Sequence, residues 1–132
     1  LHKRDSIMND LHLPQTPNTP AVTTDLATGV VTMAGDSYPE NPFEFFQPLI
    51  DWIDGFLHRQ SGPLSLVLDL VYLNTSSIRA MMDIFDRMEE AHRAGAKVSV
   101  RWSYDPENER VGELAEEFRD DCTFPFLIEP RF

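Results

Sequence analysis

The sequence is poor in the residues and runs that build disulfides, thiolate metal sites and membrane spans. It has one cysteine, Cys122, so no disulfide can form within the chain and no pair of thiols can hold a zinc ion. Asp120 and Asp121 precede that cysteine and disfavour a reactive thiolate. No apolar run approaches the roughly 20 residues that a membrane-spanning helix needs. The first residues also lack the apolar stretch of a signal peptide. These absences predict a cytoplasmic protein without direct membrane insertion.

Positive charge is scarce as well. Eleven Lys and Arg stand against 22 Asp and Glu, which gives a formal net charge of −11 at pH 7. Surfaces that bind nucleic acids or anionic membranes depend on basic patches, so this balance argues against a nucleic-acid partner. The chain has no glycine-rich phosphate loop and no histidine spacing typical of a metal or catalytic site. It therefore predicts a non-catalytic protein with no metal and no cofactor. A hydrolase, the alternative from another class, would need a pocket that holds a histidine beside an acid.

What is present suffices for one folded domain. The chain has 132 residues, of which 42% are hydrophobic and 25% charged, so it can bury a core. Residues 1–7 precede Met8, which looks like a natural start, and are interpreted as an expression scar or an upstream extension. Residues 8–20 hold three prolines, which predict an extended arm rather than a regular element, because proline fixes φ and lacks the amide hydrogen. Residues 21–132 are expected to form the single domain.

Apolar periodicity predicts strands that alternate with helices in the domain. Residues 21–35 are typical of a hairpin, and strands are expected at 64–72, 97–104 and 124–128. Pro125 favours an edge position for the last of these. Helices are expected from Asn41 to before residue 61, from 75 to 93 and from 107 to 120; Pro48 should kink the first helix or give it a 3₁₀ start. The pattern predicts an α/β fold with a mixed sheet of about five strands, an N-terminal hairpin and three main helices.

The most informative junction is the one at residues 74–77, where a β-rich apolar run meets helical periodicity. Asn74, Thr75, Ser76 and Ser77 are all of types that cap helix N-termini. Capping is the simplest reading of this turn. The alternative is a phosphorylation site, because the free amides and positive dipole end of a helix tolerate an added phosphate. The residues alone do not rank Thr75 above Ser76 or Ser77 as the acceptor.

A second polar loop precedes the first predicted helix. Loops that follow parallel strands gather at one edge of a sheet, so Tyr38, Glu40 and Asn41 are expected near Thr75 on a partner-binding surface. The alternative is a structural turn in which Asn41 and Glu44 form a capping box. Arg79 lies four residues after Thr75, a spacing from which it could reach a phosphate, although it could also be an ordinary solvated arginine. Asn74, Ser76 and Ser77 complete the expected partner surface.

Four blocks of sequence resemble the SiaC family of bacterial regulatory phosphoproteins. They cover residues 35–41, 72–85, 101–104 and 116–126, in order along the domain. The strand, polar turn and helix also resemble the phosphorylation site of anti-sigma-factor antagonists of the STAS class. The resemblance implies a STAS-like fold and phosphorylation of Thr75 by a dedicated protein kinase, reversed by a PP2C-type phosphatase.

The same resemblance implies a function in signal transduction. In the SiaC family the unphosphorylated protein binds a diguanylate cyclase and promotes cyclic-di-GMP synthesis, which favours biofilm formation. The alternative is an anti-sigma-factor antagonist in a partner-switching system.

Overall fold

The computed structural model describes residues 8–59 and 62–132. Residues 1–7, interpreted above as a scar or extension, lie outside the described part. The described residues form strands and helices in this order: β1 (His12–Leu13), β2 (Ala21–Asp25), β3 (Val30–Ser37), α1 (Pro42–Arg59), β4 (Leu64–Leu73), α2 (Thr75–Arg93), β5 (Val98–Tyr104), α3 (Glu109–Asp120) and β6 (Phe126–Pro130).

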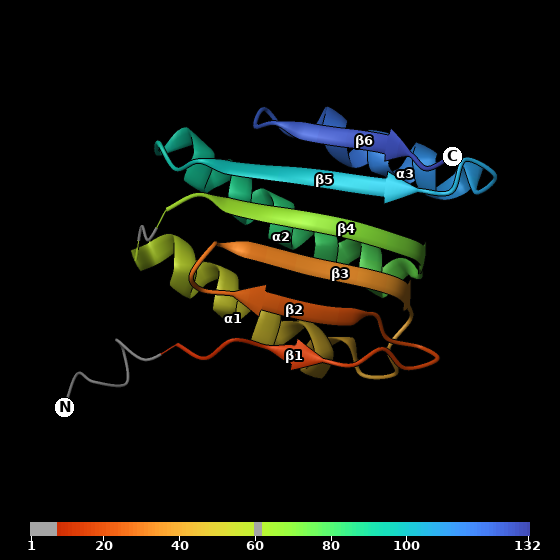
Figure 1. Ribbon diagram of the computed structural model, residues 1–132, viewed down its shortest axis with the longest axis horizontal. Helices are drawn as coiled ribbons and strands as arrows, with labels where there is room; N and C mark the ends of the chain where they lie inside the picture. Colours follow the sequence, from red (N-terminus) through yellow and green to blue (C-terminus); the bar gives the residue numbers. More distant parts are fainter. Residues whose placement is uncertain (1–7, 60–61) are drawn as a thin grey trace.

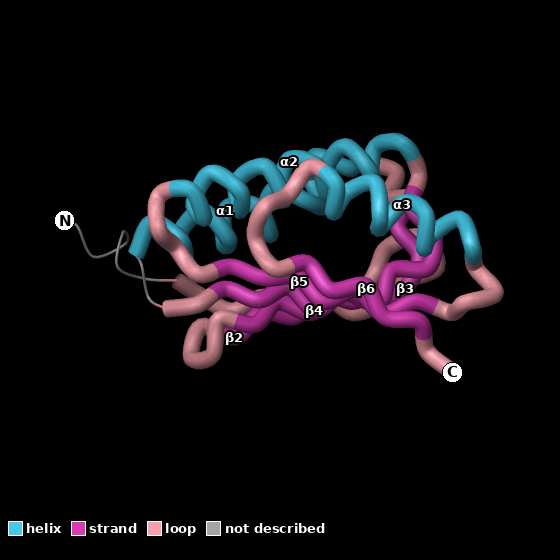
Figure 2. The backbone as a smooth tube through the Cα atoms, turned by 90° about the horizontal axis from the view of Figure 1, so that it is seen from above, coloured by secondary structure: helices cyan, strands magenta, loops and turns pink. Residues whose placement is uncertain are grey.

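One sheet contains all six strands, and their order in the sheet is their order in the chain. β1, β2 and β3 pair antiparallel, whereas β3, β4, β5 and β6 pair in parallel. Each parallel step passes through a helix and moves one strand in the same direction. Because such crossovers share one hand, all the connecting helices lie on the same face of the sheet, as Figures 1 and 2 show. None of the described helices lies on the other face.

The core lies between the sheet and its helices. On β4, Leu64, Leu66 and Leu68 are fully buried beneath the helices, whereas Val67 on the opposite face is 37% exposed. This alternation follows from the two-residue repeat of a strand and marks a sheet with only one covered face. The helices contribute large buried side chains such as Phe56 from α1 and Met88 from α2.

The predicted α/β class, the N-terminal hairpin and the three helices are confirmed, with two corrections. His12 and Leu13, expected in an irregular arm, pair with β2, so the sheet has six strands rather than about five. The carboxylate of Asp10 helps to hold this segment, because it accepts hydrogen bonds from the Thr24 hydroxyl at 2.9 Å and the Leu26 amide at 3.0 Å. Although this stretch is rich in proline, His12 and Leu13 still supply the backbone groups through which it pairs with β2.

In the first helix, the 3₁₀ start that was one of the two expectations for Pro48 is not observed, while the kink stays a prediction. α1 runs through Pro48 as one α-helix, without the 3₁₀ start that the proline suggested. Pro48 is exposed, so its ring faces water while Leu49 and Ile50 anchor the helix on the sheet. Burial of that apolar face offsets the missing backbone hydrogen bond. The edge position expected for the last strand is confirmed, since β6 ends the sheet.

Candidate functional site

The polar turn lies between β4 and α2, and Asn74 organises it. Asn74 Oδ1 accepts the backbone amide of Ser77 at 2.9 Å and the hydroxyl of Ser76 at 3.0 Å. The carbonyl of Asn74 accepts the first helical hydrogen bond, from the Ile78 amide at 2.9 Å. Asn74 is therefore the N-cap that its residue type predicted, with extended backbone angles and its side chain over the first turn.

The end of β3 holds this turn in place. The carbonyl of Ser37 accepts hydrogen bonds from the Asn74 amide at 3.0 Å and from the Ser77 hydroxyl at 2.9 Å. The two serine hydroxyl oxygens lie 2.8 Å apart, and both side chains are buried. These bonds join the carboxyl ends of two neighbouring strands, so Asn74 and Ser77 fix the polar turn to the end of β3.

The three hydroxyls of the turn are not equivalent. Thr75 is exposed, and among the described residues no hydrogen bond engages its hydroxyl. Ser76 is half-buried and its hydroxyl donates to Asn74, while Ser77 is fully buried. The Thr75 hydroxyl is therefore accessible from solvent in the folded protein, whereas the Ser77 hydroxyl is not. This corrects the expectation for Ser77, which was placed on the partner surface and instead fastens the turn to β3.

Arg79 extends the exposed side of the turn. It lies one helical turn after Thr75 on α2, its side chain is exposed, and within the described ranges no carboxylate forms an ion pair with it. A guanidinium at this spacing is free to contact a group attached to Thr75. Its contact with a phosphate remains a prediction.

The loop after β3 divides into two parts. Tyr38 lies beside the turn, because its ring meets that of Tyr72 edge to face with centroids 5.8 Å apart. Asn41 caps α1, accepting the Glu44 amide at 3.2 Å. Glu40 and Asn41 are exposed and line a groove with the N-terminal segment. Tyr38 therefore contacts the strand that leads into the turn, whereas its proximity to Thr75 and the contribution of Tyr38, Glu40 and Asn41 to partner binding stay predictions.

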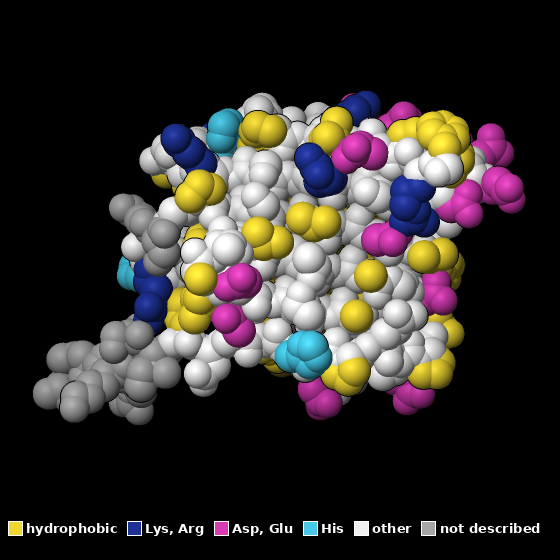
Figure 3. Space-filling model, viewed as in Figure 1, with side chains coloured by type: hydrophobic (Ala, Val, Ile, Leu, Met, Phe, Trp, Pro, Cys, Tyr) yellow, Lys and Arg dark blue, Asp and Glu magenta, His cyan; other side chains and the backbone are white. Residues whose placement is uncertain are grey.

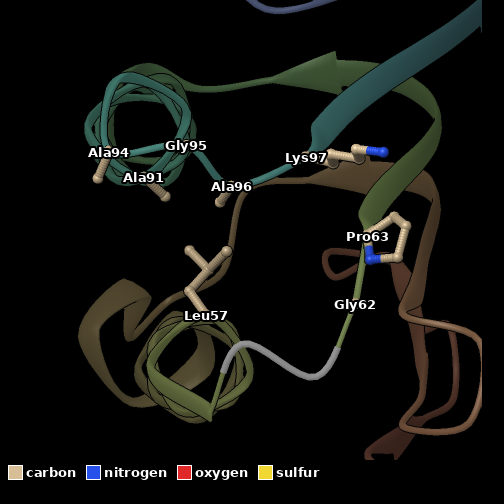
Figure 4. A pocket seen from close by; sticks show the side chains of 8 residues that line it. All are labelled: Leu57, Gly62, Pro63, Ala91, Ala94, Gly95, Ala96 and Lys97. Carbon is tan, nitrogen blue, oxygen red and sulfur yellow. The ribbon is translucent and has the colours of Figure 1, made fainter.

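A pocket of about 340 Å³ lies at the other end of the helices and offers little chemistry. Its lining comes from the ends of α1 and α2 and from the segments before β4 and β5, and Figure 4 shows the Lys97 side chain directed away from Leu57 and Ala91. The lining side chains include no carboxylate, imidazole or thiol. The pocket therefore does not bring together the histidine and acid that a hydrolase would need. Its lining residues are Leu57, Gly62, Pro63, Ala91, Ala94, Gly95, Ala96 and Lys97.

A more open pocket between α1 and α2 does hold a histidine with acids, since His58 lines it together with Asp54, Asp83, Asp86 and Glu90. Within the described ranges no hydrogen bond or ion pair joins His58 to any of these carboxylates, so they do not form a histidine–acid pair.

Burial, helped by the negative charges of Glu89 and Asp121, raises the pKa of the Cys122 thiol to about 11, so the thiol stays protonated near neutral pH. The described residues contain no cluster of three or more histidine, cysteine, aspartate or glutamate side chains suited to a metal ion. None of the described helices combines the length and apolarity needed to cross a bilayer.

Comparison with known proteins identifies the family. The model of the SiaC family regulatory phosphoproteins matches residues 13–131, which is nearly the whole domain. The chain belongs to the SiaC family. A relative within the range of this family, an uncharacterized protein of Pseudomonas aeruginosa strain UCBPP-PA14, is 59% identical over 122 residues, covering 92% of this chain and 97% of its own length.

Solved SiaC structures share the fold. Apo-SiaC from Pseudomonas aeruginosa superposes with a TM-score of 0.88 at 57% identity, covering 92% of this chain and 99% of the SiaC chain. SiaC has also been solved in complex with the diguanylate cyclase SiaD, of which it is the activator. That SiaC chain gives a TM-score of 0.90 at 58% identity, covering 92% of this chain and 100% of its own.

Two residues of the junction had no assigned role at the sequence level. Ser37 and Tyr72 both lie within blocks that resemble the SiaC family, but their roles depend on contacts across the sheet. Ser37 was expected in the polar loop after the predicted hairpin, which ended at residue 35, whereas β3 runs on to Ser37. For Tyr72, the two-residue alternation of β4 predicts a buried side chain, whereas the structure places it at the surface.

Proposed function

We propose that this protein is a non-catalytic regulatory phosphoprotein whose Thr75 hydroxyl controls the binding and activation of a diguanylate cyclase. In this proposal the unphosphorylated form binds the cyclase and promotes cyclic-di-GMP synthesis and biofilm formation. A dedicated protein kinase adds the phosphate and a PP2C-type phosphatase removes it. Membership of the SiaC family and the SiaC–SiaD complex of Pseudomonas aeruginosa support this assignment.

The observation that carries the proposal is the exposure of Thr75 on a turn that Asn74 and Ser77 fix to the end of β3. The neighbouring side chains bond to one another and to Ser37, so the only unengaged hydroxyl of the turn is the one that faces solvent. Phosphorylation adds a charge of about −1.5 to −2. At this position the charge meets the positive end of the α2 dipole and leaves the core untouched. A partner surface fitted to a neutral hydroxyl would lose its fit through repulsion and desolvation.

The proposal is tested first by locating the phosphate. Intact-mass and peptide-mapping measurements on the protein isolated from its native host should find one phosphate, on Thr75. The Thr75→Ala variant should carry none, and Ser76→Ala should be phosphorylated as the wild type is. A phosphate on Ser76 in the wild type would contradict the assignment.

The second test measures binding to SiaD of Pseudomonas aeruginosa, the cyclase of the solved complex. Wild type and Thr75→Ala should bind it, whereas Thr75→Glu should bind at least about tenfold more weakly, since a buried like charge or unpaired carboxylate costs 1.4 kcal/mol or more. Thr75→Gln is the matched neutral control. If Thr75→Glu and Thr75→Gln bound SiaD with equal affinity, the proposed phosphorylation switch would be contradicted. Capture of an anti-sigma factor instead of a cyclase from the native host would favour the partner-switching alternative.

A further inference from the structure

The register between β3 and β4 changes just before the polar turn. Gly35 pairs with Leu70 and Asp36 pairs with Tyr72, so Val71 is an extra residue on β4. The side chains reflect this β-bulge: Leu70 and Leu73 are both buried, three residues apart, with Val71 and Tyr72 exposed between them. An uninterrupted two-residue alternation would have placed Tyr72 in the core. The bulge therefore turns an aromatic side chain outward, immediately before Asn74.

Tyr72 does not stand alone on that surface. Its ring packs edge to face against Tyr38 at 5.8 Å and 72°, and the two side chains are 54% and 42% exposed. Each side chain fixes the position of the other, so the pair is preorganised while much of its area still faces water. Large half-exposed aromatic side chains of this kind are typical of the anchor residues of protein interfaces.

A residue from a third element holds the bulge. Beyond Leu68 the pairing of β4 with β5 ends, and the carbonyl of Val71 instead accepts a hydrogen bond from Asn108 Nδ2 at 2.8 Å. The other side-chain atom of Asn108, Oδ1, caps α3 by accepting the Val111 amide at 3.3 Å. One amide thus stabilises both the start of α3 and the irregularity that exposes Tyr72.

We propose that the Tyr38–Tyr72 pair is the apolar anchor on which the diguanylate cyclase docks, and that Asn108 is a positioning residue that keeps the pair at the surface. The inference rests on the proposed function. Tyr72 lies near the end of β4 and Thr75 follows three residues later at the start of α2, so the pair adjoins the residue through which the cyclase is proposed to be controlled. An apolar segment of the cyclase seated on the two rings would bury the Thr75 hydroxyl at its margin. A phosphate there would then have to be desolvated for docking to occur, which explains why one modification can prevent binding.

The test compares binding of single variants to purified SiaD of Pseudomonas aeruginosa. Tyr72→Ala and Tyr38→Ala should each weaken binding at least about tenfold, as truncation of an anchor residue does. Tyr72→Phe should bind nearly as well as the wild type, because the ring supplies the contact. Leu127→Ala is the matched control: Leu127 is 49% exposed on β6, two strands away from β4, and its truncation should leave the affinity unchanged.

The positioning role of Asn108 needs a variant that keeps the helix cap. Asn108→Asp retains the Oδ1 acceptor for the Val111 amide, and it replaces the donor to Val71 with a carboxylate oxygen that repels the Val71 carbonyl. It should weaken SiaD binding severalfold while its thermal unfolding midpoint stays close to that of the wild type. An unchanged affinity would overturn the positioning role.

The outcomes separate the two proposals. If Tyr72→Ala binds as the wild type does while Thr75→Glu loses binding, the anchor is wrong and the phosphorylation switch stands. If Tyr72→Ala loses binding while Thr75→Glu binds normally, the docking surface stands and the switch is wrong. If the wild type fails to bind SiaD, the proposed function fails and the anchor fails with it.

Discussion

At the scale of single residues, the junction works because a few polar side chains each satisfy more than one backbone group. Asn74 caps α2 through its side chain, and its backbone amide donates a hydrogen bond to the carbonyl of Ser37. Ser77 donates to the same carbonyl from inside the fold. Asn108 both caps α3 and bonds to the bulge of β4. Thr75, by contrast, is exposed, and among the described residues its hydroxyl takes part in none of these hydrogen bonds.

Because these side chains make different hydrogen bonds, we expect substitutions of Asn74 and of Thr75 to differ sharply in their effect on the free energy of unfolding. Asn74→Ala should lower the free energy of unfolding by about 0.5–2 kcal/mol, because the Ser77 amide and Ser76 hydroxyl lose their acceptor. Thr75→Ala should change it by about 0.5 kcal/mol or less. Urea denaturation followed by circular dichroism measures both values. A loss at Thr75 as large as that at Asn74 would show that Thr75 has a structural role.

At the scale of the elements, the ends of the helices determine how neighbouring parts of the chain are joined. The carboxylate of Glu89, in the last half of α2, accepts the amide and the hydroxyl of Thr123 at 2.8 and 2.6 Å and pairs with Arg93 at 2.9 Å. These interactions fasten the segment between α3 and β6 to α2. The hydrogen bonds from Thr123, followed by that from Arg93, lower the pKa of Glu89 from its usual 4.5 to about 2.

The lowered pKa predicts how this link responds to acid. A folded-state pKa below that of the unfolded chain contributes stability that is present above about pH 4.5 and is lost as the pH falls toward about 2. Glu89→Gln should therefore be less stable than the wild type at pH 7, and the difference should shrink as the pH falls from 5 to about 2. Urea unfolding at a series of pH values measures it.

Glu90→Gln, at the exposed neighbouring position, serves as the control for the charge change itself and should show little difference at any pH. If the difference in free energy of unfolding between the wild type and Glu89→Gln stayed constant across the pH series, the stabilising role of the Glu89 charge would be contradicted.

At the scale of the whole molecule, the sheet separates two unlike surfaces. More than half of the acidic residues lie on the three helices, which cover one face. Figure 3 shows the uncovered face, where acidic and basic side chains lie among hydrophobic and other ones. Two ion pairs, Arg101 with Glu129 at 3.1 Å and Arg131, just after β6, with Asp69, neutralise part of this charge. The helices also carry six of the 11 Lys and Arg, so they account for −6 of the formal net charge of −11, and the negative field of the molecule arises from both sides of the sheet.

The one-sided sheet predicts opposite outcomes for two neighbouring residues of β4. Leu66→Ala should lower the free energy of unfolding by about 2–5 kcal/mol, because it opens a cavity beneath the helices. Val67→Ala, on the uncovered face, should lower it by about 1 kcal/mol or less. Comparable losses at the two positions, measured by urea denaturation, would mean that another part of the molecule covers the open face.

Much of the architecture could be read from the sequence. The helix that begins at Thr75 and ends at Arg93 follows from its apolar spacing and its cap, and the edge position of β6 follows from Pro125. The pairing of residues 12–13 could not be predicted, since a two-residue strand has no periodicity of its own. The 3₁₀ start expected at Pro48 did not form, because the burial of α1 outweighs a local preference.

The sequence by itself determined the class of fold, the polar turn and the candidate acceptor residues, because periodicity and capping act over a few neighbouring positions. Only the tertiary structure distinguished the three hydroxyls, buried Ser77 against β3 and turned Tyr72 outward. Those outcomes depend on hydrogen bonds and packing between segments 37–40 residues apart, such as Ser37 with Ser77 and Val71 with Asn108. Local sequence patterns carry no information on contacts at that separation.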